Sequence, residues 1–205
     1  QFAGCTQLPP LAALGSLGDV LALRVAARLT AREALAVGVN WTYAPVADLD
    51  LEPANPIVGT RSLGRDPDVV AAAVTEMIDA LQGEGMLACA KHFPGHGRTT
   101  TDSHAVLPVV HATREELQVD LTPFVAAIDA GVASIMTAHV AYPALDPSGA
   151  PATCSPAIVN ALLREELGFE GLIVTDALVM GGVQDEGGEG HTAARALAAG
   201  CDLLL

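Results

Sequence analysis

The chain has 205 residues, of which 51% are hydrophobic, and it contains no apolar run long enough to cross a bilayer without interruption by charge, Gly or Pro. Its net charge is −14 and it has no basic patch, which argues against a nucleic-acid partner. Aromatic residues make up only 3%, so we expect a core of Ala, Val and Leu, which favours the α/β class.

Capping residues divide the chain into repeated strand-helix units. The expected helices run over about residues 17–36, from Asp66-Pro67 to Gly83, from a capping box at Thr113 to Glu116, and from Ser155-Pro156 to Gly168. Pro123 is expected to break the third of these, with a further helix following it to Gly131.

Five short apolar segments between these helices are the strand candidates, at residues 40–45, 86–90, 133–137, 172–175 and 202–205. The helix before the first segment implies at least one earlier strand. A closed eight-stranded barrel typically needs about 250 residues. The sequence therefore predicts a (β/α)8 TIM-barrel type of α/β fold, incomplete in this chain, with about five to six βα units.

An open doubly wound sheet is the alternative, but no glycine-rich phosphate loop follows any strand candidate. An unclosed barrel exposes strand edges and apolar faces, so we expect the chain by itself to be marginally stable or prone to aggregate. The four cysteines, Cys5, Cys89, Cys154 and Cys201, show no CxxC spacing and are interpreted as small, buried or partly buried residues.

Three clusters of polar residues come after strand candidates, at the edge of a parallel sheet where active sites are built: residues 91–97, residues 102–104 and Asp176. Asp176 ends an apolar strand, where a carboxylate is costly to bury unless it is paired. It is a candidate nucleophile, and a helix N-cap or a structural ion pair is the alternative. Asp102 and His104 are one residue apart, so that in extended backbone the carboxylate could orient the imidazole as a proton shuttle. A surface turn is the alternative for that pair.

Lys91 and His92 place a cation beside a directional hydrogen-bonding group, which suits the hydroxyls of a polar ligand. A salt-bridged Lys and a buried, satisfied His are the alternative. His92 and His96 have the spacing of a helical zinc pair, but Pro94 and the neighbouring glycines disfavour a helix there. We therefore expect neither a metal nor another cofactor, and we expect His96 to anchor a sharply turning loop.

The string Lys91-His-Phe-Pro-Gly-His-Gly97 followed by Asp102-Ser-His104 closely resembles the signature loop of β-N-acetylglucosaminidases of glycoside hydrolase family 3. Further strings agree with that family in the same order, over a match that runs from about Leu8 to the last residue. They are Tyr43-Ala-Pro-Val46 with Asp48, Gly59-Thr-Arg-Ser-Leu-Gly64 with Asp66-Pro67, Thr137-Ala-His-Val140, and Leu167-Gly-Phe-Glu-Gly171 before Ile173-Val-Thr-Asp176.

The resemblance implies that residues 1–205 are part of a barrel-type catalytic domain that acts on an N-acetylglucosamine-containing glycoside, often a cell-wall muropeptide sugar. It implies a retaining, two-step mechanism with Asp176 as nucleophile and with His104, backed by Asp102, as acid/base. Arg61 and the Lys91-His92 pair match positions that bind the terminal sugar. The glycines of the signature loop lead us to expect motion of that loop between Gly95 and His104.

Two departures from the family pattern accompany the resemblance. Ala177 stands where related enzymes often have a second Asp, and the segment that follows reads Val179-Met-Gly-Gly182. The family also has, before the position of Leu8, an Asp-Gln-Glu-Gly-Gly string with a sugar-binding Asp, so part of the sugar site is expected to be missing here. A non-catalytic carbohydrate-binding remnant is therefore one alternative to a hydrolase. A glycoside phosphorylase is another, because phosphate could intercept the same covalent intermediate and a His acid/base repels that anion less than a Glu would.

Overall fold

The computed structural model describes residues 4–184 and 187–205. Three parallel strands form its central sheet in the order β1 (Cys89–Phe93), β2 (Ser134–Thr137) and β3 (Leu172–Val174). On the outer side of β1, Trp41 and Val46 form parallel bridges to Leu87 and Lys91, and on the outer side of β3, Leu203 bridges Val174. The five strand candidates thus lie side by side in chain order, and the parallel α/β arrangement is confirmed.

The first and last candidates are bridges rather than continuous strands. The first segment still exchanges backbone hydrogen bonds with the chain beside it, from Thr42 to the Leu87 carbonyl (2.9 Å) and from Cys89 to the Ala44 carbonyl (2.8 Å). The Ala44-Pro45 peptide is cis, as are Lys91-His92 and Phe93-Pro94. Because Pro45 has no N–H, regular pairing cannot continue through it.

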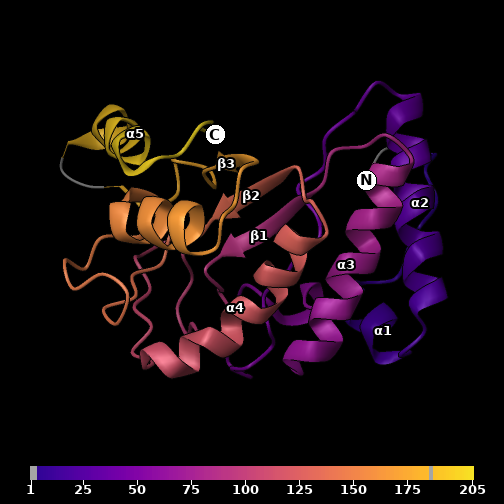
Figure 1. Cartoon of the computed structure of the whole chain (residues 1–205), viewed down its shortest axis with the longest axis horizontal. Helices are drawn as coiled ribbons and strands as arrows, with labels where there is room; N and C mark the ends of the chain where they lie inside the picture. The colour runs from indigo at the N-terminus through magenta and orange to yellow at the C-terminus, as the bar shows by residue number, and fades with distance from the viewer. Residues whose placement is uncertain (1–3, 185–186) are drawn as a thin grey trace.

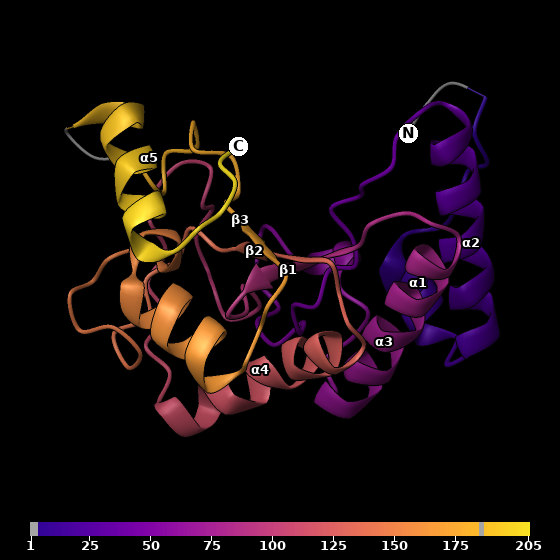
Figure 2. The same ribbon diagram turned by 45° about the horizontal axis from the view of Figure 1, so that its top comes forward.

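Helices cover the outside of the strands (Figure 1), and Figure 2 shows them following one another in chain order around the sheet. They are α1 (Leu11–Ser16), α2 (Val20–Ala36), α3 (Pro67–Gly83), α4 (Arg114–Asp129), η3 (Ala157–Glu166) and α5 (Gly188–Ala199), with short turns η1 (Gly59–Arg61) and η2 (Ala152–Cys154) between them. No helix in the described ranges is long and apolar enough to span a membrane. Cys5 is partly exposed and the other three cysteines are buried, as expected.

The predicted caps of two helices are confirmed. The Asp66 carboxylate accepts hydrogen bonds from the Asp68 and Val69 N–H groups at the start of α3. At the start of α4, the Thr113 hydroxyl accepts from the Glu116 N–H while the Glu116 carboxylate accepts from the Thr113 N–H. These contacts satisfy N–H groups that have no partner within the helix.

The prediction that Pro123 breaks a helix is wrong. α4 runs without interruption from Arg114 to Asp129, although its ribbon bends partway along in Figure 1. An internal Pro costs a helix about 3 kcal/mol. The buried side chains of Leu117, Leu121 and Phe124 lie on the same helix, and burying each contributes roughly 2 kcal/mol, which outweighs that cost.

Two other helices differ from the expectation, one in its first residue and one in its existence. The helix expected from residue 17 starts at Val20, because Gly18 adopts a left-handed φ of +62° and the Asp19 carboxylate caps the Leu21 and Ala22 N–H groups. The helix α5 was not predicted, since glycines at its first positions are poor helix formers. Gly200, with a φ of +112°, ends it.

Candidate active site

The carboxyl ends of the parallel strands bring the polar side chains of the site together. Lys91 and His92 lie in β1, and Asp176 follows the end of β3 by two residues. Asp48 follows the segment that bridges to β1 through Val46. These residues come from segments far apart in the sequence, yet they share one edge of the sheet, as active-site residues of parallel α/β folds do.

Asp48 is a buried hydrogen-bonding centre for this edge. Its carboxylate accepts from the backbone N–H of His92 (3.1 Å) and of His96 (2.7 Å), and it contacts the Nδ1 atom of the His92 ring at 2.7 Å. Burial would raise the pKa of Asp48, but the contacts with His92 and His96 outweigh it and lower that pKa to about 2. The carboxylate therefore holds Nδ1–H of His92 as a donor and leaves Nε2 facing the site.

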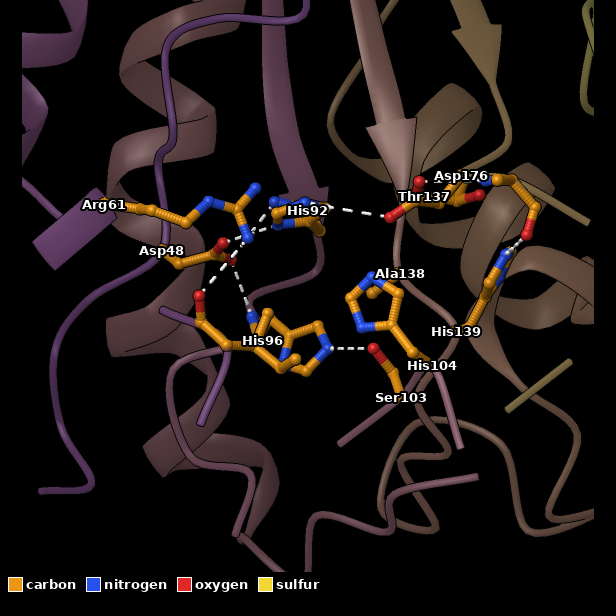
Figure 3. Close-up of polar contacts among 12 residues, drawn as sticks. Asp48, Arg61, His92, His96, Ser103, His104, Thr137, Ala138, His139 and Asp176 are labelled. Carbon is orange, nitrogen blue, oxygen red and sulfur yellow. Dashed lines mark hydrogen bonds and ion pairs between the residues drawn. The ribbon is translucent and has the colours of Figure 1, made fainter. Parts of the chain in front are cut away.

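The Nε2 atom of His92 lies 3.8 Å from Oδ2 of Asp176, and Figure 3 shows the two side chains facing each other. Oδ1 of Asp176 accepts the Ala177 N–H at 2.8 Å. Burial raises the pKa of Asp176, but His92, the Ala177 N–H, His139 and Lys91 together lower it below its ordinary value. Asp176 is therefore ionised at neutral pH. No helix begins at this residue in the described chain, so the N-cap alternative is not supported.

Lys91 is partly buried, and its Nζ atom lies 6.0 Å from the centre of the Tyr43 ring. Burial lowers its pKa, the neighbouring charge of Arg61 lowers it further, and Asp176 partly opposes them. Arg61 lies in η1, where it donates to the Ile57 carbonyl (3.2 Å), and its side chain points toward His92 in Figure 3. Within the part of the chain that is described, Lys91 forms no ion pair with a carboxylate inside 4 Å, unlike a structural salt bridge.

The loop after β1 carries the Asp102–His104 pair. Oδ1 of Asp102 accepts the His104 backbone N–H at 2.8 Å and contacts the His104 Nδ1 atom at 2.7 Å. The segment is a turn and not the extended backbone that the spacing suggested, because the Asp102 carboxylate closes the turn by bonding to the N–H two residues on. The His104 N–H first, and then its ring, lower the pKa of Asp102.

The loop is anchored at both ends. His96, which was expected to anchor it, contacts the Thr99 hydroxyl through Nδ1 (2.8 Å) and the Ser103 hydroxyl through Nε2 (3.0 Å). Gly181 and Gly182, which follow Asp176 by a few residues, donate their N–H groups to the carbonyls of His104 and Ser103, both at 2.9 Å. Figure 3 shows the His104 ring projecting from this loop into the space framed by His92, His96 and Asp176.

The glycines that depart from the family pattern are therefore the surface on which the loop rests. A Cβ atom on Gly181 would lie 2.5 Å from the Ala105 carbonyl oxygen, and one on Gly182 would lie 2.5 Å from that of Ser103. Only glycine permits so close an approach between the two backbones. The sequence shows the two glycines but not the partner that requires them.

His139 was not singled out as a site residue. It is buried, with Nδ1 contacting the Thr153 hydroxyl (2.8 Å) and Nε2 contacting the Ala177 carbonyl (3.1 Å), so it holds the chain directly after Asp176. Burial lowers its pKa, although Asp176 opposes that shift. A His two residues after an apolar strand is the signal that could have identified it. Among the described residues, no group of three or more His, Cys, Asp or Glu side chains is arranged to hold a metal ion.

Comparison with known proteins places this arrangement in a family. Residues 1–205 match the description "Glycosyl hydrolase family 3 N terminal domain". The chain belongs to glycosyl hydrolase family 3. Membership in this family confirms the predicted TIM-barrel type of α/β fold.

Relatives in family 3 carry related names. A beta-hexosaminidase of Nitrosomonas eutropha is 40% identical over 98% of this chain and 59% of its own length. A family 3 beta-N-acetylglucosaminidase structure from Paenibacillus is similar with a TM-score of 0.98 and 43% identity, covering 100% of this chain and 39% of that one. The structure of NagZ from Neisseria gonorrhoeae in complex with N-trifluoroacetyl-D-glucosamine is similar with a TM-score of 0.89 and 37% identity. The match covers 100% of this chain and 61% of that one. The chain thus spans about three fifths of the length of this Nitrosomonas beta-hexosaminidase, and only 36% of that of a Cellulomonas fimi beta-N-acetylglucosaminidase/beta-glucosidase.

Proposed function

We propose that residues 1–205 are part of the catalytic domain of a retaining exo-glycosidase that hydrolyses terminal β-linked N-acetylglucosamine. The observation that carries the proposal is an ionised Asp176 after β3 together with an Asp102–His104 dyad whose loop carbonyls accept hydrogen bonds from Gly181 and Gly182, a few residues after Asp176. The names of the relatives support the sugar. Neither a metal nor another cofactor takes part in the proposed reaction.

In the first step, a carboxylate oxygen of Asp176 attacks the anomeric carbon while Nε2–H of His104 protonates the departing oxygen. The glycosidic bond breaks, the aglycone leaves as an alcohol, and the sugar is bound to Asp176 as an ester. Asp102 stabilises the imidazolium through Nδ1. Water then attacks the anomeric carbon and gives a proton to His104, while the bond between that carbon and the Asp176 oxygen breaks. The Asp176 carboxylate is regenerated and the sugar leaves with its original configuration.

Arg61, Lys91 and His92 bind the hydroxyls of the terminal sugar in this proposal. Lys91 and His92 are held at the strand end beside Asp176, and His92 is oriented by the buried Asp48. The substrate is a small carbohydrate, an N-acetylglucosamine-containing glycoside or a muropeptide. A side chain fixed by a buried carboxylate loses little conformational entropy when it binds a hydroxyl.

The test is turnover by the full-length protein of a chromogenic N-acetylglucosaminide and of the matching glucoside, each with and without inorganic phosphate. We expect free N-acetylglucosamine as the product, with the glucoside processed more slowly. Sugar 1-phosphate as the main product would instead assign a phosphorylase. Binding of the N-acetylglucosaminide without turnover would assign a non-catalytic carbohydrate-binding protein.

A further inference from the structure

Asp120 is a buried carboxylate on α4 that the proposed mechanism does not use. Its side chain is 2% exposed, and Oδ2 accepts a hydrogen bond from Nε of Arg98 at 2.8 Å. Arg98 also donates to the Glu116 carbonyl at 3.3 Å. Oδ1 of Asp120 is buried and has no hydrogen-bond partner in the described chain, which is costly for a carboxylate.

The partner of Asp120 lies in the loop that carries the Asp102–His104 pair. Gly95, where this loop begins, lies against Asp120 so closely that a Cβ atom on Gly95 would be 3.0 Å from the Asp120 Cβ. The hydroxyl of Tyr142 donates to the Gly95 carbonyl at 2.8 Å on the same side. The root of the loop is thus fixed to α4 at two points, Gly95 and Arg98.

His96 lies between these two points in the sequence and connects the root of the loop to the Asp102–His104 pair. Its ring contacts the Ser103 hydroxyl, which stands between Asp102 and His104. A shift of the loop root would therefore move the dyad, and misplacing a catalytic group by about 1 Å can cost roughly a hundredfold in rate.

We propose that Asp120, acting through Arg98, is a positioning residue that sets the loop so that His104 can protonate the leaving group. The inference rests on the proposed function and adds a residue to it that touches neither the sugar nor the reacting atoms. The charged and titratable groups around Asp120 are Arg98, Asp48 and Tyr142. Burial raises the pKa of Asp120 to about 6 against the opposing effect of Arg98.

The test compares aryl N-acetylglucosaminides whose leaving groups differ in their need for a proton. Phenol leaves slowly without acid assistance, whereas 2,4-dinitrophenol leaves readily as an anion. For Arg98→Met and Asp120→Asn in the full-length protein, we expect kcat/KM for the phenyl glycoside to fall about 10- to 100-fold, within the range of general-acid catalysis. For the dinitrophenyl glycoside we expect less than about a threefold change, as for His104→Ala.

The matched control is Arg114→Met on the same helix. Arg114 pairs with Glu166 of η3 at 3.0 Å in an exposed ion pair that includes no residue of the loop, and its loss should change neither rate. Equal losses on both glycosides, or no loss, in folded Arg98→Met or Asp120→Asn protein would overturn the positioning role. Failure of both variants to fold would assign the pair to stability and overturn it as well. If the wild-type protein cleaves neither glycoside, the proposed function fails first, and this inference fails with it.

Discussion

At the scale of single residues, the pKa values of the two site carboxylates, Asp48 and Asp176, depend on the groups that each one contacts. Asp48 is buried and Asp176 is partly buried, yet both have a lowered pKa because His92 lies between them. Burial acts alone on neither group. The same histidine thus links the ionisation of the proposed nucleophile to the buried Asp48.

Replacing Asp176 tests its proposed role directly. Asp176→Ala removes the attacking oxygen, so we expect kcat to fall by at least about a thousandfold. We expect the fold to persist, because within the described ranges the Asp176 side chain makes one hydrogen bond, to the N–H of the next residue. Hydrolysis rate and thermal unfolding midpoint, measured on the same preparation, check both expectations. Wild-type turnover in the variant would reject the assignment.

Asp48 should make stability depend on pH in a defined window. Its pKa is lowered from 3.8 to about 2, so the folded state favours the ionised form; the resulting stabilisation is complete above about pH 4 and is lost as the pH falls toward 2. A shift of this size corresponds to about 2 kcal/mol. Urea unfolding from pH 5 to 2 should therefore show a smaller loss of unfolding free energy for Asp48→Asn than for wild type. Parallel pH curves for the two proteins would contradict this.

At the scale of elements, the hydrogen bonds between the loop that carries the Asp102–His104 pair and the Gly181-Gly182 backbone hold the proposed acid/base next to the segment that follows the proposed nucleophile. Gly181→Ala would place a Cβ atom 2.5 Å from the Ala105 carbonyl and 3.0 Å from that of His104, so the loop must move away. We expect kcat/KM for a phenyl N-acetylglucosaminide to fall at least about tenfold.

Gly190→Ala is the control for that substitution. Gly190 lies in α5, and a Cβ atom there meets no other atom within 4 Å. The change should leave activity as it is and raise helix stability by about 1 kcal/mol, because alanine favours a helix over glycine. Equal activity in the Gly181 and Gly190 variants would show that the loop does not depend on this contact.

The elements were predictable where a local signal decides them. The caps at Asp66 and Thr113 are local, and both were predicted. Pro123 is also a strong local signal, but the buried face of α4 overrides it, and packing is not visible in a short window of sequence. The helix α5 was not predicted, because its first positions are glycines and its buried residues Thr192, Ala196 and Ala199 stabilise it through packing.

In the candidate site, too, some residues were predictable from the sequence and others were not. Polar residues after apolar strands identified Lys91, His92 and Asp176, because parallel strands end at one edge of a sheet. The contact of Asp48 with His92 joins residues 44 positions apart, and that of His139 with the Ala177 carbonyl joins residues 38 apart. Only the folded chain brings such residues together.

At the scale of the whole molecule, three parallel strands and the bridged segments on either side of them lie in chain order. Side chains from distant segments are thus brought together at one edge of the sheet, at the carboxyl ends of the strands. Membership in family 3 and the strand-end placement of Asp176 support one central claim, that this carboxylate forms a covalent bond to the sugar. In the proposed mechanism, the Asp102–His104 dyad exchanges the protons, Arg61 and the Lys91-His92 pair bind the sugar, and Asp120 with Arg98 positions the dyad loop.

The most direct test of that claim is to trap the intermediate. The full-length protein would be incubated with a 5-fluoro-N-acetylglucosaminyl fluoride, whose second fluorine slows breakdown of a glycosyl ester, and then digested and mapped by mass spectrometry. We expect the added sugar on the peptide that contains Asp176, and no label in Asp176→Ala. A sugar attached to another residue, or rapid turnover of N-acetylglucosaminides that gives a product of inverted configuration, would contradict the account.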